Sequence, residues 1–91
     1  MPENTQAIRI AAPGMPVDGW VAYFVPATKV EPEAVGRLAV VTLANKGGRH
    51  VRVLQRGYAA GKGNLRSLVD ASAELADVDI ESAAPVVWVK A

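Results

Sequence analysis

Residues 36 to 57 of this 91-residue chain have the sequence Gly36-Arg-Leu-Ala-Val-Val-Thr-Leu-Ala-Asn-Lys-Gly-Gly-Arg-His-Val-Arg-Val-Leu-Gln-Arg-Gly57. An apolar run from Leu38 to Leu43 comes first, and a turn with two glycines, Asn45 to Gly48, follows it. The next run, His50 to Arg56, alternates polar and apolar residues. Two strand-length runs separated by a glycine turn predict a β-hairpin with strands over 38–43 and 50–56.

Short strand signals recur outside the hairpin, whereas no long window shows the i, i+3, i+4, i+7 apolar spacing of an amphipathic helix. The other expected elements are strands over Ala7–Ala11, Trp20–Val25 and Asn64–Val69, one helical turn over Glu31–Ala34, a polar turn or short helix over Ser72–Asp77, and a final strand or strands at Ile80 and Val86–Val89, interrupted by Pro85. We therefore predict a mostly β fold, either a small twisted antiparallel sheet or a partly closed barrel.

The composition is that of one domain spanning residues 1–91. Cysteine is absent, so no disulfide or thiolate chemistry is available. No apolar run approaches the roughly 18 residues of a membrane span, and residues 1–6 lack the basic-then-apolar pattern of a secretory signal. We expect a cytoplasmic protein with no membrane association and no cofactor.

The charges are segregated along the chain, although the net charge is only +1. Residues 46–66 contain six basic side chains and no acidic one, and residues 67–91 contain five acidic side chains against Lys90. Such a block either binds a polyanion or faces the acidic C-terminal part of its own chain or of a partner. The second arrangement is the commoner one in a small fold.

The polyanion alternative is a nucleic-acid-binding β domain. In an extended strand, His50, Arg52, Leu54 and Arg56 share one face, and Tyr58 follows them for base stacking. Three other aromatic residues, Trp20, Phe24 and Trp88, are expected to be core anchors. The basic residues that this alternative would use are Arg49, Arg52, Arg56, Lys62 and Arg66.

Three further patterns are better explained without a catalytic or metal site. His50 is the only histidine and has no nucleophile motif near it, so we expect an ordinary strand residue. Asp77, Asp79 and Glu81 would share one face of an extended strand, where a hard cation could bind. A solvated or ion-paired edge is the simpler expectation, and we predict no metal site. The loop Gly57–Gly63 lacks the Gly-Lys-Ser/Thr ending of a phosphate-binding loop.

Five segments in order resemble the C-terminal domain of the LexA-like, self-cleaving repressors, especially the phage-repressor branch. The resemblance covers residues 15–91 and implies a fold of the LexA C-terminal-domain type. The segments are Asp18-Gly19 followed by an apolar strand, Gly36-Arg37-Leu38-Ala39-Val40-Val41, Val51-Arg52-Val53-Leu54 with Arg56-Gly57, Asn64-Leu65-Arg66-Ser67, and Ala84-Pro85-Val86-Val87-Trp88-Val89.

Two departures from the family pattern concern its serine–lysine dyad. Gly14, in Pro13-Gly14-Met15, stands where the resemblance would place the nucleophilic serine, and Arg52 stands at the lysine position. The family mechanism needs a hydroxyl beside an amine that burial has made neutral. Glycine has no side chain, and a guanidinium stays protonated at any workable pH. We therefore expect no peptidase activity and no catalytic residues.

The resemblance implies a non-catalytic domain that serves as a dimerisation or regulatory interaction module, linked to transcription regulation. C-terminal strands mediate pairing in LexA-like domains, and here the last strand is apolar on both faces. We predict a homodimer with Val86, Val87, Trp88 and Val89 at the interface. A different protein partner is the alternative.

Overall fold

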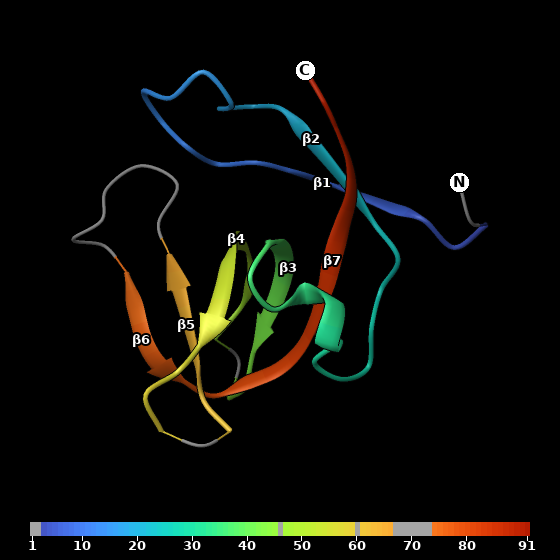
Figure 1. The fold of residues 1–91 in the computed structure, drawn as a ribbon. Helices are drawn as coiled ribbons and strands as arrows, with labels where there is room; N and C mark the ends of the chain where they lie inside the picture. The colour runs from blue at the N-terminus through green and yellow to red at the C-terminus, as the bar shows by residue number, and fades with distance from the viewer. Residues whose placement is uncertain (1–2, 46, 60, 67–73) are drawn as a thin grey trace.

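The computed structural model describes residues 3–45, 47–59, 61–66 and 74–91. In these residues the chain forms seven strands and one short 3-10 helix (Figure 1). The elements are β1 (Gln6–Arg9), β2 (Val21–Phe24), η1 (Pro32–Ala34), β3 (Leu38–Leu43), β4 (Arg49–Arg56), β5 (Gly63–Arg66), β6 (Leu75–Val78) and β7 (Ile80–Lys90).

The strands form one open sheet in the order β1-β2-β7-β3-β4-β5-β6, and every ladder between them is antiparallel. The last strand lies near the middle of the sheet, where it pairs with β2 at one end and with β3 at the other. Figure 1 shows β7 as a long curved strand that links the β1–β2 pair to the lower strands. The mostly β prediction is confirmed, and of its two forms the open sheet is the one observed.

The predicted hairpin is β3 and β4, in register from Leu38 opposite Val53 to Thr42 opposite Arg49. Leu43 donates its amide to the Gly48 carbonyl across the turn, at 2.9 Å. Gly48 has a φ of 84°, a left-handed conformation that glycine adopts without steric cost. The helical turn expected over 31–34 is η1, which begins at a proline, as the first position of a helix favours.

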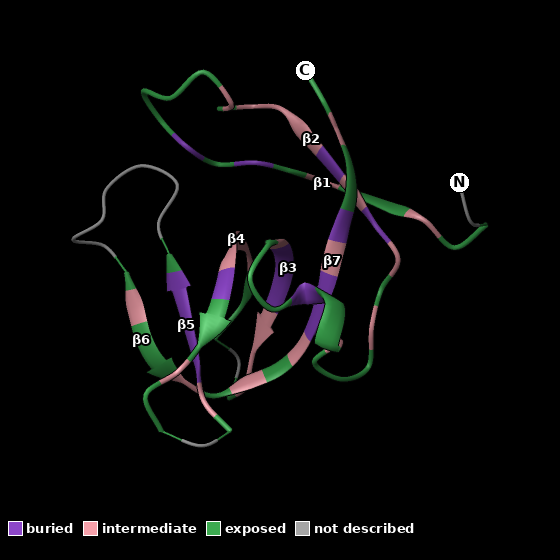
Figure 2. Cartoon of the chain, in the orientation of Figure 1, coloured by how far each residue is buried: buried purple, intermediate pink, exposed green. Residues whose placement is uncertain are grey.

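Two hydrophobic clusters cover the two faces of the central strands. Val40 and Ala84 belong to a cluster with Phe24, whereas the neighbouring residues Val41 and Ala83 belong to a second cluster. Successive side chains of a strand point to opposite faces, so β3 is buried on both sides. Figure 2 shows this burial as purple along β3, β5 and the middle of β7. The second cluster also contains Ala34, Ala39, Leu54 and Leu65.

Two sequence-based element assignments need correction, and a third is confirmed only for the residues that the structure describes. Residues 75–77, expected in a polar turn or short helix, belong to strand β6, while 72 and 73 lie outside the described residues. The strand expected over 64–69 is described as Gly63–Arg66, and residues 67–69 lie outside the described part. The final strand is not interrupted at Pro85, because Pro85 is the last residue paired with β3 and Val86 is the first paired with β2.

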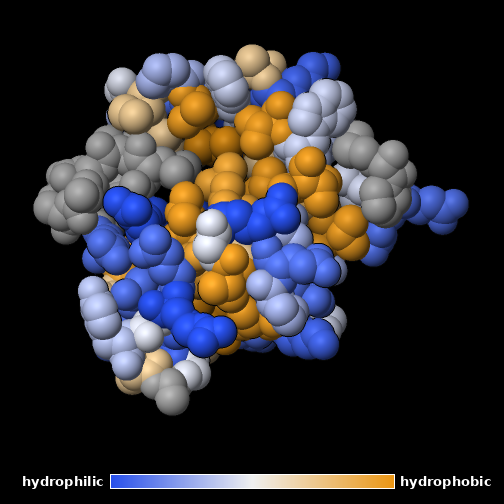
Figure 3. All heavy atoms as spheres, viewed as in Figure 1, coloured by the Kyte–Doolittle hydropathy of each residue, from blue (hydrophilic) through white to orange (hydrophobic). Residues whose placement is uncertain are grey.

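The surface is mixed in polarity. Figure 3 shows hydrophobic residues gathering across the middle of the viewed face, with hydrophilic residues on either side. Within the described ranges, no helix has the length and apolar character that crossing a membrane requires.

Candidate functional site

The C-terminal end of β7 is paired along one edge. The ladder with β2 pairs Val86, Trp88, Val89 and Lys90, whereas the ladder with β3 ends at Pro85. In the described part of the chain, no strand lies against the other edge of residues 87–90. A free strand edge presents unpaired backbone N–H and C=O groups to any strand that approaches it.

An irregularity in the register determines which side chains this end of β7 exposes. Phe24 lies opposite Val86 and Tyr23 lies opposite Trp88, so Val87 has no partner residue on β2. The extra residue of a bulge reverses the alternation of side chains beyond it. Val86 therefore stays in the core at 7% exposure, while Val87 and Trp88 are 52% and 55% exposed.

Trp88 is thus not the core anchor that its size suggested. Its ring lies beside that of Tyr23, with centroids 5.8 Å apart and planes tilted by 31°. The expectation was right for Phe24, which is buried, and Trp20 packs in part against the same cluster. The four predicted interface residues accordingly differ: Val87 and Trp88 are exposed, Val86 is buried and Val89 packs against the core.

The five basic residues of the nucleic-acid alternative do not share one surface. Arg52 and Arg56 alternate with Leu54 on one face of β4, as the strand period predicts. Arg49 belongs to the other face, with its guanidinium 5.5 Å from the centroid of the Phe24 ring. Arg66 lies on β5 opposite Val53, which also belongs to that other face. Lys62 forms an ion pair with Asp79.

The two positions of the resembled dyad offer no nucleophile and no neutral amine. Gly14 lies in a turn with a φ of 84°, a backbone conformation that suits glycine. Arg52 lines a small hollow of about 140 Å³ together with Arg9 and Ala11. Ala11 is three residues before Gly14, so the chain that leads to Gly14 lies near Arg52. A guanidinium at this position cannot take the proton of a nucleophile, as the lysine of the resembled family does.

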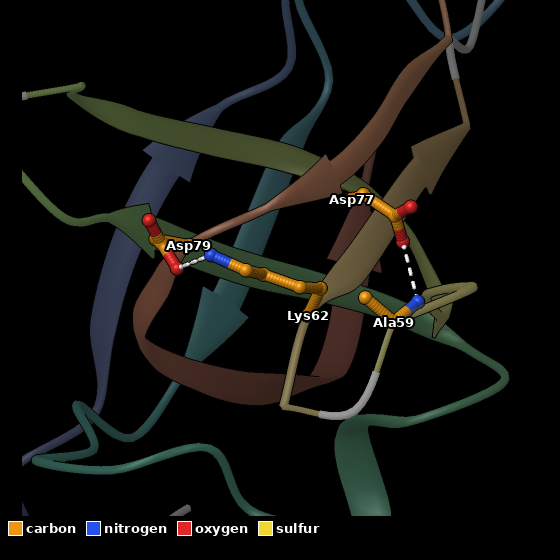
Figure 4. Close-up of polar contacts among 4 residues, drawn as sticks. All are labelled: Ala59, Lys62, Asp77 and Asp79. Atoms are coloured by element: carbon orange, nitrogen blue, oxygen red, sulfur yellow. Dashed lines mark hydrogen bonds and ion pairs between the residues drawn. The ribbon is translucent and has the colours of Figure 1, made fainter.

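The loop between β4 and β5 is tied to the acidic C-terminal part of the chain (Figure 4). The Asp77 carboxylate accepts hydrogen bonds from the amides of Tyr58, at 2.6 Å, and Ala59, at 3.1 Å. The Asp77 amide donates to the buried Asn64 side chain at 2.8 Å. The ion pair between Lys62 and Asp79 adds a second tie. Sequence inspection missed this role of Asp77, because its partner amides lie 18 and 19 residues away.

The three carboxylates expected on one strand face are not arranged as a set. Asp77 belongs to β6 and Glu81 to β7, with Asp79 between the two strands, and Asp77 and Asp79 bind different partners. No group of three metal-ligating side chains occurs in the described residues. His50 is a strand residue whose Nε2 lies 3.1 Å from the Gly47 carbonyl oxygen.

Comparisons of the chain with protein-family models, with curated proteins and with solved structures found no match. The resemblance to LexA-like domains therefore rests on the five sequence segments alone. The exposed C-terminal end of β7 is the structural feature on which a functional proposal can be based.

Proposed function

We propose that this chain is a non-catalytic interaction module that forms a homodimer through the C-terminal end of β7. The observation that supports the proposal is the exposure of Val87 and Trp88 beside a free strand edge. Burying a large aromatic side chain is strongly favourable, and pairing the edge would satisfy its backbone groups. Both gains come from one contact, a second strand laid against residues 87–90.

A second copy of the same strand is a suitable partner. Around a two-fold axis, an antiparallel pairing centred between Trp88 and Val89 places each Trp88 across from the partner's Val89. Lys90 then lies across from Val87, so the two lysines are not directly opposed. The contact is self-complementary and closes on itself, which favours a dimer over a filament.

The regulatory part of the proposal rests on the sequence resemblance. A LexA-like framework without serine at position 14 and without lysine at position 52 would retain pairing but lose self-cleavage. Such a domain would act by holding two copies together, in the cytoplasm and in the setting of transcription regulation.

Light scattering on the pure protein tests the dimer. We expect twice the chain mass for the wild type at micromolar concentration and the chain mass for Trp88→Glu. The matched control is Tyr58→Glu, which also replaces an exposed aromatic residue but lies in the loop at the opposite end of the molecule from the C-terminus (Figure 1). Circular dichroism would verify that each variant is folded.

The proposal is wrong if the wild type stays monomeric at millimolar concentration. It is equally wrong if the folded Trp88→Glu variant remains as dimeric as the wild type. A dimer disrupted by Tyr58→Glu but not by Trp88→Glu would place the interface at the other end of the sheet.

A further inference from the structure

A mostly apolar hollow lies away from the free end of β7. It is an open pocket of about 650 Å³ between η1, the end of β4 and the loop that joins β4 to β5. Val30, Val35, Leu54 and Ile80 form its apolar walls. Pockets that bind small molecules span about 300–1,000 Å³ and combine apolar walls with a few polar groups.

The apolar walls are incompletely covered by the chain itself. Val30 and Val35 are 37% and 39% exposed, and Tyr58, at the same pocket, is 84% exposed. Leu54 and Ile80 continue the wall inward to the second hydrophobic cluster. A ligand with an apolar body would therefore cover side chains that otherwise face water.

The loop wall is held in place before any ligand arrives. Asp77 binds the amides of Tyr58 and Ala59, and the Gly57 amide donates to the Lys62 carbonyl at 2.9 Å. Gly57 packs directly against Asp77, because a Cβ at position 57 would lie 2.6 Å from the Asp77 carboxylate oxygen. A larger residue at position 57 would therefore displace the loop. A preformed wall lowers the entropy cost of binding.

The cations at the pocket differ in what they already bind. The Lys62 ammonium is paired with Asp79. Arg56 is exposed and lines the pocket, and within the described residues it has no carboxylate partner. A guanidinium binds a carboxylate through two parallel hydrogen bonds, so Arg56 favours a ligand with a carboxylate at one end.

We propose that this pocket binds a small amphipathic monocarboxylate, with its apolar body against Val35, Leu54 and Ile80 and its carboxylate at Arg56. The proposal is independent of the dimer proposed above, because none of residues 86–90 at the C-terminal end of β7 lines the pocket. The pocket is lined by residues outside the proposed dimer interface, and the proposal assigns to it the class of ligand that it binds.

The test compares octanoate with octan-1-ol, which has the same apolar body without the charge. Amide NMR titrations should show saturable octanoate shifts at Val35, Leu54, Gly61 and Ile80. Octan-1-ol should bind at least about tenfold more weakly, because it lacks the charge-assisted hydrogen bond to Arg56. Arg56→Gln should reduce octanoate affinity to that of octan-1-ol and leave octan-1-ol binding unchanged.

Two further variants distinguish binding in the pocket from non-specific binding elsewhere on the protein. Val35→Trp places a large side chain in the pocket at a partly exposed position, so it should abolish binding of both ligands in a folded protein. Arg66→Gln removes an exposed arginine of the neighbouring strand that does not line the pocket, and it should change neither affinity. Equal affinities for the two ligands would overturn the proposal, as would shifts confined to residues outside the pocket or the absence of saturation.

Discussion

Asp77 shows how one side chain can organise a distant loop. Its backbone has a φ of 51°, in the left-handed region that aspartate and asparagine tolerate better than most residues. From there its carboxylate accepts the two loop amides, while its own amide is bound by Asn64. The residue combines an uncommon backbone conformation with three hydrogen bonds.

Replacing Asp77 should loosen the loop without unfolding the sheet. Asp77→Ala removes the acceptor of two amides and should cost about 1–2 kcal/mol of unfolding free energy, because a net hydrogen bond contributes about 0.5–1.5 kcal/mol. Hydrogen exchange at the Tyr58 and Ala59 amides should become faster. Asp77→Asn is the control, since its side-chain oxygen still accepts. Unchanged exchange in Asp77→Ala would mean that other contacts hold the loop.

Arg52 permits a test of the dyad assignment. Arg52→Lys restores the amine of the resembled family but leaves Gly14 without a nucleophile. We expect one intact band on a denaturing gel after incubation at alkaline pH, for the variant as for the wild type. Specific fragments from the variant alone would show that the nucleophile lies at a different position.

At the scale of single elements, β3 is buried on both faces. Val40 is 3% exposed in one cluster and Val41 is fully buried in the other. Val40→Thr and Val41→Thr should each destabilise the fold by about 1–3 kcal/mol, since each buries a hydroxyl in an apolar cluster. Urea denaturation would measure both losses.

The neighbouring strand β4 provides the contrast for that prediction. Leu54 is buried, whereas Gln55 is exposed, so Gln55→Thr should change the unfolding free energy by less than about 0.5 kcal/mol. If one of the two β3 substitutions is equally harmless, the strand is covered on one face only.

At the scale of the whole molecule, dimer formation should link stability to concentration. When two folded chains associate and unfolded chains do not, mass action raises the thermal midpoint as the protein concentration rises. We expect the wild-type midpoint to increase across a hundredfold concentration range and the Trp88→Glu midpoint to stay constant. A wild-type midpoint independent of concentration would argue against the dimer.

The charge distribution over the whole molecule bears on the nucleic-acid alternative. Arg49 and Arg66 belong to the opposite face of the sheet from Arg52 and Arg56, and Lys62 is ion-paired. A strand of nucleic acid following one face would contact about two of these cations, so its affinity should depend only shallowly on salt concentration. A steep salt dependence in a fluorescence titration with single-stranded DNA would revive the alternative.

Local patterns in the sequence were sufficient for several elements. The hairpin over β3 and β4 follows from two strand-length runs and a glycine turn, and η1 follows from a proline at the start of one helical turn. The alternation of Arg52, Leu54 and Arg56 on one face of β4 is also a local property, because strand geometry sets the period. Composition excluded disulfides and thiolate chemistry directly.

Features that depend on distant partners were decided only by the tertiary structure. The chain from Leu75 to Val78 is a strand because β5 pairs with it, although its own residues suggested a turn. Trp88 is exposed because the register with β2 skips Val87, and β7 continues through Pro85 because its partner changes there from β3 to β2. Strands that pair across a sheet are often far apart in sequence, whereas the residues of a turn are adjacent. No local pattern in the sequence could therefore specify these pairings, or the pocket that forms between η1, β4 and the loop after β4.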